Sequence, residues 1–159
     1  MAASTTKKAI VRRFEKEPLA GYVNPVSYLQ PVGVELLTAQ GNISTVPWDD
    51  IKTVVFVRDF DAGEPERRVF HVRPKMEGLW LSFRFRDDDV MEGIMPNNLL
   101  QLEHYGFTVI PPDPYSNNQR VFVPRVALRS VEVLGVVGSP LRRRKPKPAA
   151  KEQIGLFDE

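Results

Sequence analysis

The chain has 159 residues, of which 42% are hydrophobic and 26% charged, and it contains no cysteine. Such a composition indicates a folded protein and excludes a wholly disordered one, while the missing cysteines exclude disulfides, iron–sulfur clusters and thiolate zinc sites. No apolar run approaches the length of a membrane span, and the first residues carry charges without an apolar signal core. We therefore expect a cytoplasmic protein that does not contact membranes.

The positive charge is concentrated at the C-terminal end. From Ser139 onward there are six basic and three acidic residues, a net charge of +3, whereas the preceding part has 16 basic and 17 acidic residues, a net charge of −1. Proline and like charges punctuate this stretch, SPLRRRKPKPAAKEQIGLFDE. The pattern predicts a disordered basic tail over residues 139–159 that follows a nearly neutral folded part.

An internal repeat organises the folded part. Residues of one type recur in the same order at offsets that rise from 71 to 77. Self-similarity of this kind predicts two copies of one module, over residues 7–57 and 78–138, joined by a connecting segment over residues 58–77. The matched positions are Phe14, Gly21, Gly33, Pro47, Ile51 and Val54, which recur as Phe85, Gly93, Gly106, Pro124, Leu128 and Val131.

Each copy has the pattern of short strands. Leu81, Phe83 and Phe85 alternate with polar residues, the period of two that places apolar side chains on one face of a sheet. Turn residues recur about every ten positions, and residues 48–50 and 125–127 predict helical turns before the last strand of each copy. We predict an all-β fold of two tandem SH3-like or Sm-like small barrels. Residues 97–104 allow a short helix capped by Asn97 or Asn98.

Two stretches carry a resemblance to a known family. IKTVVFVRDF from Ile51 and GFTVIPPDPYSNNQRVFVPRVALRSVEVL from Gly106 resemble an uncharacterised bacterial family, a domain of unknown function. The resemblance spans roughly residues 7–135. It implies a bacterial cytoplasmic protein, and because the family has no known activity it transfers no catalytic residue.

The sequence shows no catalytic or metal-binding constellation. Asp87, Asp88 and Asp89 form an acidic triplet, but the first copy has no such triplet there, so a solvated turn is the favoured interpretation. His71 falls on the polar face of an expected strand and His104 closes the possible helix, and neither belongs to a motif. The glycines form no phosphate-binding loop. We expect a protein that is not an enzyme and has no cofactor and no metal.

A groove between the two copies is the candidate site within the folded part. Tyr105, Tyr115, Asn117 and Asn118 offer rings and amides for a ligand, although the asparagines also suit a turn. Sm-like barrels commonly bind RNA, but the corresponding loop over residues 48–50 is acidic here, so nucleic-acid binding is expected to be weak.

The tail ends in a short apolar motif. Gln153-Ile154-Gly155-Leu156-Phe157 resembles the Q-x-x-L-F peptide by which bacterial DNA polymerases and repair factors bind the sliding clamp. The resemblance implies that Gln153 hydrogen-bonds in one subsite and that Leu156 and Phe157 fill an apolar pocket. The tail arginines Arg142, Arg143 and Arg144 would add a salt-sensitive attraction.

The preferred hypothesis is therefore an adaptor whose C-terminal peptide binds a protein partner, the sliding clamp. The alternative is a regulatory module that binds a ligand or nucleic acid in the groove between the barrels, with the tail incidental. An enzyme ranks third. The sequence leaves the oligomeric state and the pathway open.

Overall fold

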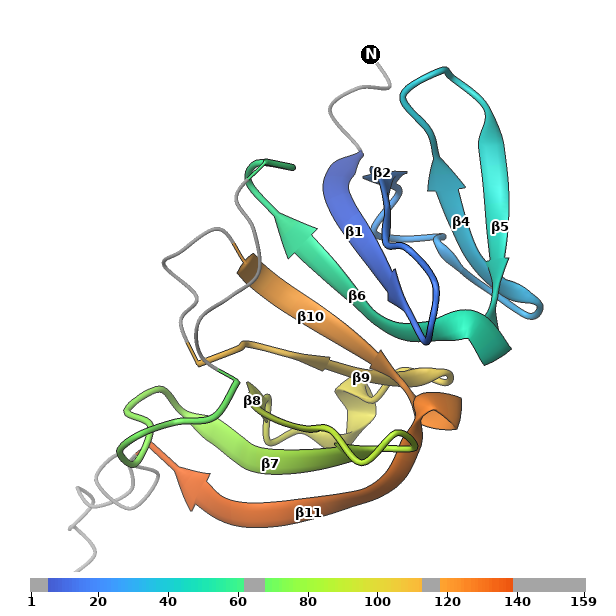
Figure 1. Ribbon diagram of the computed structural model, residues 1–159. Helices are drawn as coiled ribbons and strands as arrows, with labels where there is room; N and C mark the ends of the chain where they lie inside the picture. The colour runs from blue at the N-terminus through green and yellow to red at the C-terminus, as the bar shows by residue number, and fades with distance from the viewer. Residues whose placement is uncertain (1–5, 62–67, 113–117, 139–159) are drawn as a thin grey trace, which may run out of the picture.

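The fold was analysed in a computed structural model that describes residues 6–61, 68–112 and 118–138. The described part is built from strands joined by turns of three-residue 3-10 helix, so the predicted all-β class is confirmed (Figure 1). The strands are β1 (Lys7–Arg13), β2 (Leu19–Val23), β3 (Leu29–Gln30), β4 (Gly33–Leu37), β5 (Ile43–Pro47), β6 (Ile51–Val57), β7 (Gly78–Phe85), β8 (Val90–Met95), β9 (Gly106–Val109), β10 (Asn118–Pro124) and β11 (Leu128–Val137). The 3-10 turns are η2 (Trp48–Asp50), η3 (Leu99–Gln101) and η4 (Arg125–Ala127).

The strands fall into two halves with the same order of pairing. In the first half, β1 lies between β2 and β6, β2 continues to β4, and β4 pairs with β5. In the second half, β7 lies between β8 and β11, and β9 pairs with β10. The bridge between Ile94 and Ile110 joins β8 to β9, as the pair Tyr22–Leu37 joins β2 to β4. All of these pairs are antiparallel.

The two halves also share a bulge, although β11 has a second register shift between Val133 and Gly135 that the first half lacks in its β1–β6 ladder. The β1–β6 ladder skips Lys52 at a bulge, and the β7–β11 ladder skips Arg129 at the equivalent place. The backbone amide of Phe14 donates to the Asp50 carbonyl, as the amide of Arg86 donates to the Ala127 carbonyl. The register therefore aligns Phe14 with Arg86, one residue away from the Phe85 that the sequence comparison had matched to it. The structural offset in this region is 72 residues, because Ala9 pairs with Gly21 as Leu81 pairs with Gly93. The match of Phe14 with Phe85, at an offset of 71, agreed in residue type and not in position.

Equivalent glycines sit where two strands approach closely. A Cβ added to Gly33 would lie 1.9 Å from the Val46 carbonyl oxygen, and one added to Gly106 would lie 2.2 Å from that of Val123. Each glycine faces the proline that ends the neighbouring strand, across the pairs Gly33–Pro47 and Gly106–Pro124. No side chain fits at either position, which explains why both halves keep glycine there.

The halves are fused by the pairing of β6 with β10. Val55 lies opposite Val121 and Val54 lies opposite Phe122, and this ladder extends the first sheet into the second half (Figure 1). Because opposite residues share a face, the ladder divides its side chains between two cores. Val54 and Phe122 enter the core of the first half, whereas Val55 and Val121 enter the core of the second. Each core is completed by the other half.

Two local predictions need correction, while the predicted turns at η2 and η4 are confirmed. His71 lies in irregular backbone and not on a strand, because this segment borders β8 through single hydrogen bonds and Pro74 lacks an amide donor. The possible helix over residues 97–104 is one 3-10 turn, with the Asn98 side chain accepting from the Leu100 amide. No helix in the described ranges has the length and apolar character to cross a membrane.

Candidate functional site

A cavity of about 250 Å³ lies where the two halves meet. Its walls come from β1, β6 and the β1–β2 turn of the first half, and from β7, β8, β10 and nearby loops of the second. The cavity therefore forms only when the two halves are joined. The lining residues are Arg12, Arg13, Lys16, Pro18, Lys52, Thr53, Val55, Arg68, Phe85, Met91, Pro111, Pro112 and Val121.

The floor of the cavity is the β6–β10 ladder. Thr53 and Val55 are two residues apart on β6 and thus point to the same side, and Val121 lies opposite Val55 on β10. Phe85 and Met91 add further apolar surface from the second half. The floor thus offers an apolar surface with one hydroxyl set into it.

That hydroxyl belongs to Thr53, the one buried polar residue among the described residues, with a relative exposure of 6%. Its side chain has no hydrogen-bond partner within the described part of the chain. Buried polar groups nearly always have a partner in the protein, a water or a ligand. Thr53 therefore marks a position at which a bound molecule would gain a hydrogen bond.

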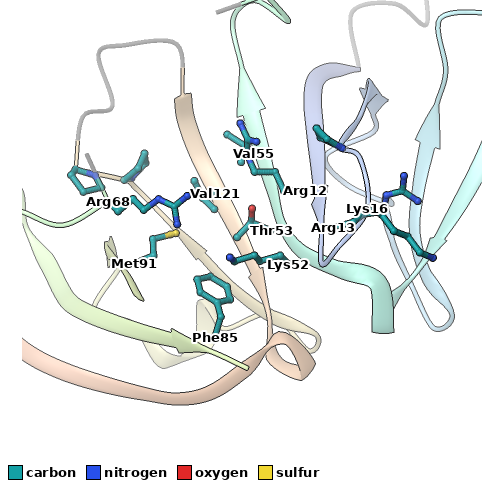
Figure 2. Close-up of a pocket in the computed structure, with 13 residues that line it drawn as sticks. Arg12, Arg13, Lys16, Lys52, Thr53, Val55, Arg68, Phe85, Met91 and Val121 are labelled. Carbon is teal, nitrogen blue, oxygen red and sulfur yellow. The ribbon is translucent and has the colours of Figure 1, made fainter. Parts of the chain in front are cut away.

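Five cationic side chains line the cavity, and no carboxylate lies among the described residues that line it. Arg12 and Arg13 are half-buried at the end of β1, and Lys16 lies in the exposed turn that follows. Figure 2 shows Arg12 and Arg68 on opposite sides of Thr53. Several cations around an apolar floor suit an organic anion, whose charge they would neutralise while its apolar part lies against the floor.

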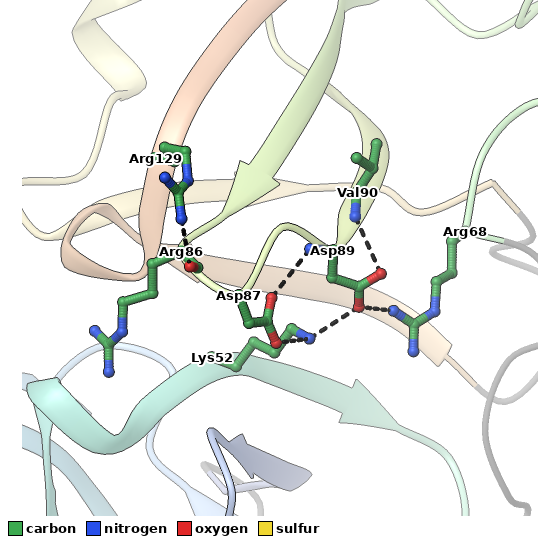
Figure 3. A network of polar contacts seen from close by, with 7 residues as sticks. All are labelled: Lys52, Arg68, Arg86, Asp87, Asp89, Val90 and Arg129. Carbon is green, nitrogen blue, oxygen red and sulfur yellow. Dashed lines mark hydrogen bonds and ion pairs between the residues drawn. The ribbon is translucent and has the colours of Figure 1, made fainter.

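A network of ion pairs holds the two halves together beside this cavity. Lys52 of β6 donates to Asp87 at 2.9 Å and to Asp89 at 2.8 Å, and Asp89 also pairs with Arg68 (Figure 3). Asp88, the middle residue of the triplet, pairs with Arg129 of β11 at 3.2 Å. The acidic triplet does form a turn, but it is not merely solvated: two of its carboxylates bind the first half.

The network changes the acidity of its carboxylates. Partial burial acts to raise the pKa of Asp87 and of Asp89, but the hydrogen bonds from Lys52 and its positive charge outweigh burial in both. The charge of Arg68 adds to this effect at Asp89. Both pKa values therefore lie below the ordinary 3.8, and the carboxylates stay ionised at neutral pH. Lys52 and Arg68 are thereby committed to the network, while Lys16 pairs with Asp50 at 3.0 Å and Arg13 Nε donates to the Glu17 carbonyl at 2.9 Å. A bound anion would share these cations with their partners in the protein.

An aromatic contact closes the same junction. The Arg86 guanidinium stacks over the Phe14 ring, 4.1 Å from its centroid, and donates to the Asp49 carbonyl of η2. Lys52 lies between the rings of Phe14 and Phe85, at 5.8 and 5.1 Å from their centroids. These contacts hold the end of β7 against β6 and so fix the position of the cavity walls relative to each other.

The residues expected in a groove lie elsewhere or outside the described part. Tyr105 stacks on Trp48, with ring centroids 5.1 Å apart, and packs against the first core instead of lining the cavity. Asn118 begins β10, where its backbone pairs with Val57. Tyr115 and Asn117 lie outside the described residues, as do Arg142, Arg143, Arg144, Gln153, Leu156 and Phe157 of the tail.

The sequence contains only a weak indication of the cavity. Arg12 and Arg13 are neighbouring basic residues in the sequence, whereas Thr53 and Arg68 are brought to the same cavity only by the fold. A metal centre has no support in the described residues, which contain no group of three or more His, Asp or Glu side chains placed to hold an ion.

Comparison with known proteins gives the family of the chain and no further relative. Searches of curated proteins and of solved structures find no match. One family description matches the sequence over residues 5–135, a range that includes both halves and confirms the resemblance to a domain of unknown function. The chain belongs to DUF6982, a family of unknown function.

Proposed function

We propose that this protein is a non-enzymatic binding module whose cavity between the halves accepts a small organic anion. The observation that carries the proposal is the buried Thr53 hydroxyl, which lacks a partner in the described part of the chain and lies among cationic side chains. A phosphate or carboxylate group would accept hydrogen bonds from the arginines and from Thr53. The apolar part of the ligand would lie against Met91 and Pro112, the half-buried apolar residues of the lining, because Val55, Phe85 and Val121 are at most 4% exposed.

The ligand has to combine charge with a flat or apolar body of modest size. A mononucleotide has both features, whereas inorganic phosphate lacks the apolar part and a nucleoside lacks the charge. A ligand that bridges the two halves would also couple binding to the geometry of the β6–β10 junction, which is what a regulatory module requires.

Calorimetric titration with AMP, adenosine, inorganic phosphate and citrate tests the proposal. We expect at least one organic anion to bind more tightly than both phosphate and adenosine. If none binds with a Kd below about 1 mM, the cavity is not an anion site. A short single-stranded oligonucleotide, included as a further arm, would identify nucleic acid as the ligand if it alone bound.

Two variants locate the binding. Thr53→Val keeps the shape and removes only the hydroxyl, so it should leave the fold intact and weaken binding several-fold. Arg13→Gln should weaken binding about tenfold, through loss of a charge-assisted hydrogen bond of about 1.5 kcal/mol. Arg84→Gln, an exposed position of β7 outside the cavity, is the matched control. Equal effects of all three variants would contradict the assignment.

The tail supports a second candidate function, adaptor binding to the bacterial sliding clamp. It rests on the resemblance of the QIGLF segment to clamp-binding peptides and on the basic stretch before it. Two anchors of the size of Leu156 and Phe157 contribute about 3 to 5 kcal/mol before ordering costs, which corresponds to a weak contact. Saturable binding of a labelled peptide 148–159 to purified clamp, abolished by Leu156→Ala with Phe157→Ala, would support it. Absence of binding up to about 100 μM would remove it.

A further inference from the structure

Two longer strand edges remain open at opposite ends of the molecule. Among the described strands, β5 pairs with β4 alone and β11 pairs with β7 alone, and the two-residue strand β3 also pairs with β4 alone. Figure 1 shows β5 at the far side of the first half and β11 at the far side of the second. Open edges present unpaired amides and carbonyls that can pair with another chain, and β11 spans ten residues.

The two open-edge strands, β5 and β11, occupy the same places in their halves as β10 and β6, the strands that pair with each other inside the chain. By the shared turns and bulges, β5 corresponds to β10 and β11 corresponds to β6, each at an offset of 77 residues. The internal β6–β10 ladder is therefore a template for a ladder between β11 of one molecule and β5 of another. Transferring the pairs Val54–Phe122, Val55–Val121 and Phe56–Arg120 predicts the pairs Val131–Thr45, Glu132–Ser44 and Val133–Ile43.

The side chains at these edges suit the transferred register. Ile43 is 70% exposed and Val133 is 60% exposed, and the register places these two apolar side chains directly opposite each other. Val131 would face Thr45, a second pair of β-branched residues of the kind that stabilises antiparallel ladders. The Ser44 hydroxyl would donate to the Glu132 carboxylate.

We propose that the β11 edge of one copy pairs with the β5 edge of a second copy, so that the chain assembles head to tail through the geometry of its own internal junction. Because the two edges differ, each new copy leaves another edge open, and assembly continues until a ring closes. Antiparallel pairing between the β11 strands of two copies is disfavoured. A register that sets Val131 of one copy opposite Val133 of the other also sets the two Glu132 carboxylates opposite each other, and like charges repel there.

Sedimentation velocity on the full chain tests this assembly. We expect the average mass to rise above the 18.1 kDa of one chain as the concentration increases toward about 500 μM, the range where a short ladder should register. Ile43→Lys and Val133→Lys should each abolish the rise while leaving the melting temperature unchanged, because both side chains are exposed. Val26→Lys, at a turn residue that is 93% exposed and lies off both edges, is the control.

Mixing the variants tests the direction and the register. The Ile43→Lys chain keeps its β11 edge and the Val133→Lys chain keeps its β5 edge, so an equimolar mixture should form a species of two chains and nothing larger. A chain carrying Ile43→Lys together with Val133→Glu should assemble again, because opposite charges would then face each other. A monomer at every concentration overturns the proposal. A wild-type dimer insensitive to both lysine variants, or a mixture that stays monomeric, overturns it equally.

Discussion

The two halves have the same strand order and an equivalent bulge at Lys52 and Arg129, yet equivalent strands differ in what they bury. Val54 of β6 is fully buried, whereas its counterpart Val131 of β11 is 36% exposed. Phe122 of β10 is fully buried, whereas its counterpart on β5 is the exposed Thr45. The backbone plan alone therefore does not decide burial. Burial depends on whether a second strand pairs with the outer edge. β6 and β10 cover each other, whereas β11 and β5 each have one described partner, and the residue types agree with this difference.

The largest contrast is expected at Phe122 and Thr45. Phe122→Ala should lower the free energy of unfolding by about 3 to 5 kcal/mol, because the ring packs against Tyr28 and Trp48 in the core of the other half. Thr45→Ala should change it by less than about 0.5 kcal/mol, since the side chain is exposed. Urea unfolding measures both. Similar losses at the two positions would show that β5 is as buried as β10 in solution.

Positions that the halves share should respond alike. Gly33→Ala and Gly106→Ala should each cost about 1 to 3 kcal/mol, because the added Cβ meets a backbone carbonyl that cannot move without breaking its ladder. Gly135→Ala is the control, since the nearest atom to its Cβ is an Arg73 nitrogen 3.6 Å away. The measurement is again urea unfolding, and a large loss at one glycine with none at the other would contradict the equivalence of these positions.

Substitutions at the two bulge residues should lower the free energy of unfolding by smaller amounts, and by different amounts from each other. Lys52→Met keeps the apolar stem and removes the ion pairs to Asp87 and Asp89, so it should cost about 1 kcal/mol. Arg129→Met removes a pair whose members are more than half exposed, and the loss should be below about 0.5 kcal/mol. The difference between the two variants measures the contribution of the junction. Added salt should shrink it, because these pairs are partly screened.

The sequence predicted the local features of this fold well. Alternation at Leu81, Phe83 and Phe85 depends on neighbouring residues alone, and all three are buried on one face of β7. The turns at η2 and η4 were predicted from their place between apolar runs. The site was not predicted, because it depends on the register between β6 and β10, which are separated by a long stretch of chain. The acidic triplet was underestimated for the same reason, since Lys52 lies 35 residues before Asp87.

The smallest effect is the pH dependence of the junction. The pKa values of Asp87 and Asp89 are below 3.8 in the folded protein, so the ionised carboxylates stabilise the fold. This stabilisation is complete above the unfolded value and is lost as the pH falls through the lower folded values. The stability difference between wild type and Lys52→Met should therefore be constant from about pH 7 to pH 5 and shrink toward zero below pH 3.8. The control is Arg125→Met, whose side chain contacts the Phe107 ring and the Glu103 backbone carbonyl but no carboxylate of a described residue, and it should show no such decline. A difference that stays constant below pH 3.8 would mean that Lys52 stabilises the junction through its contacts with Phe14 and Phe85 and not through the carboxylates.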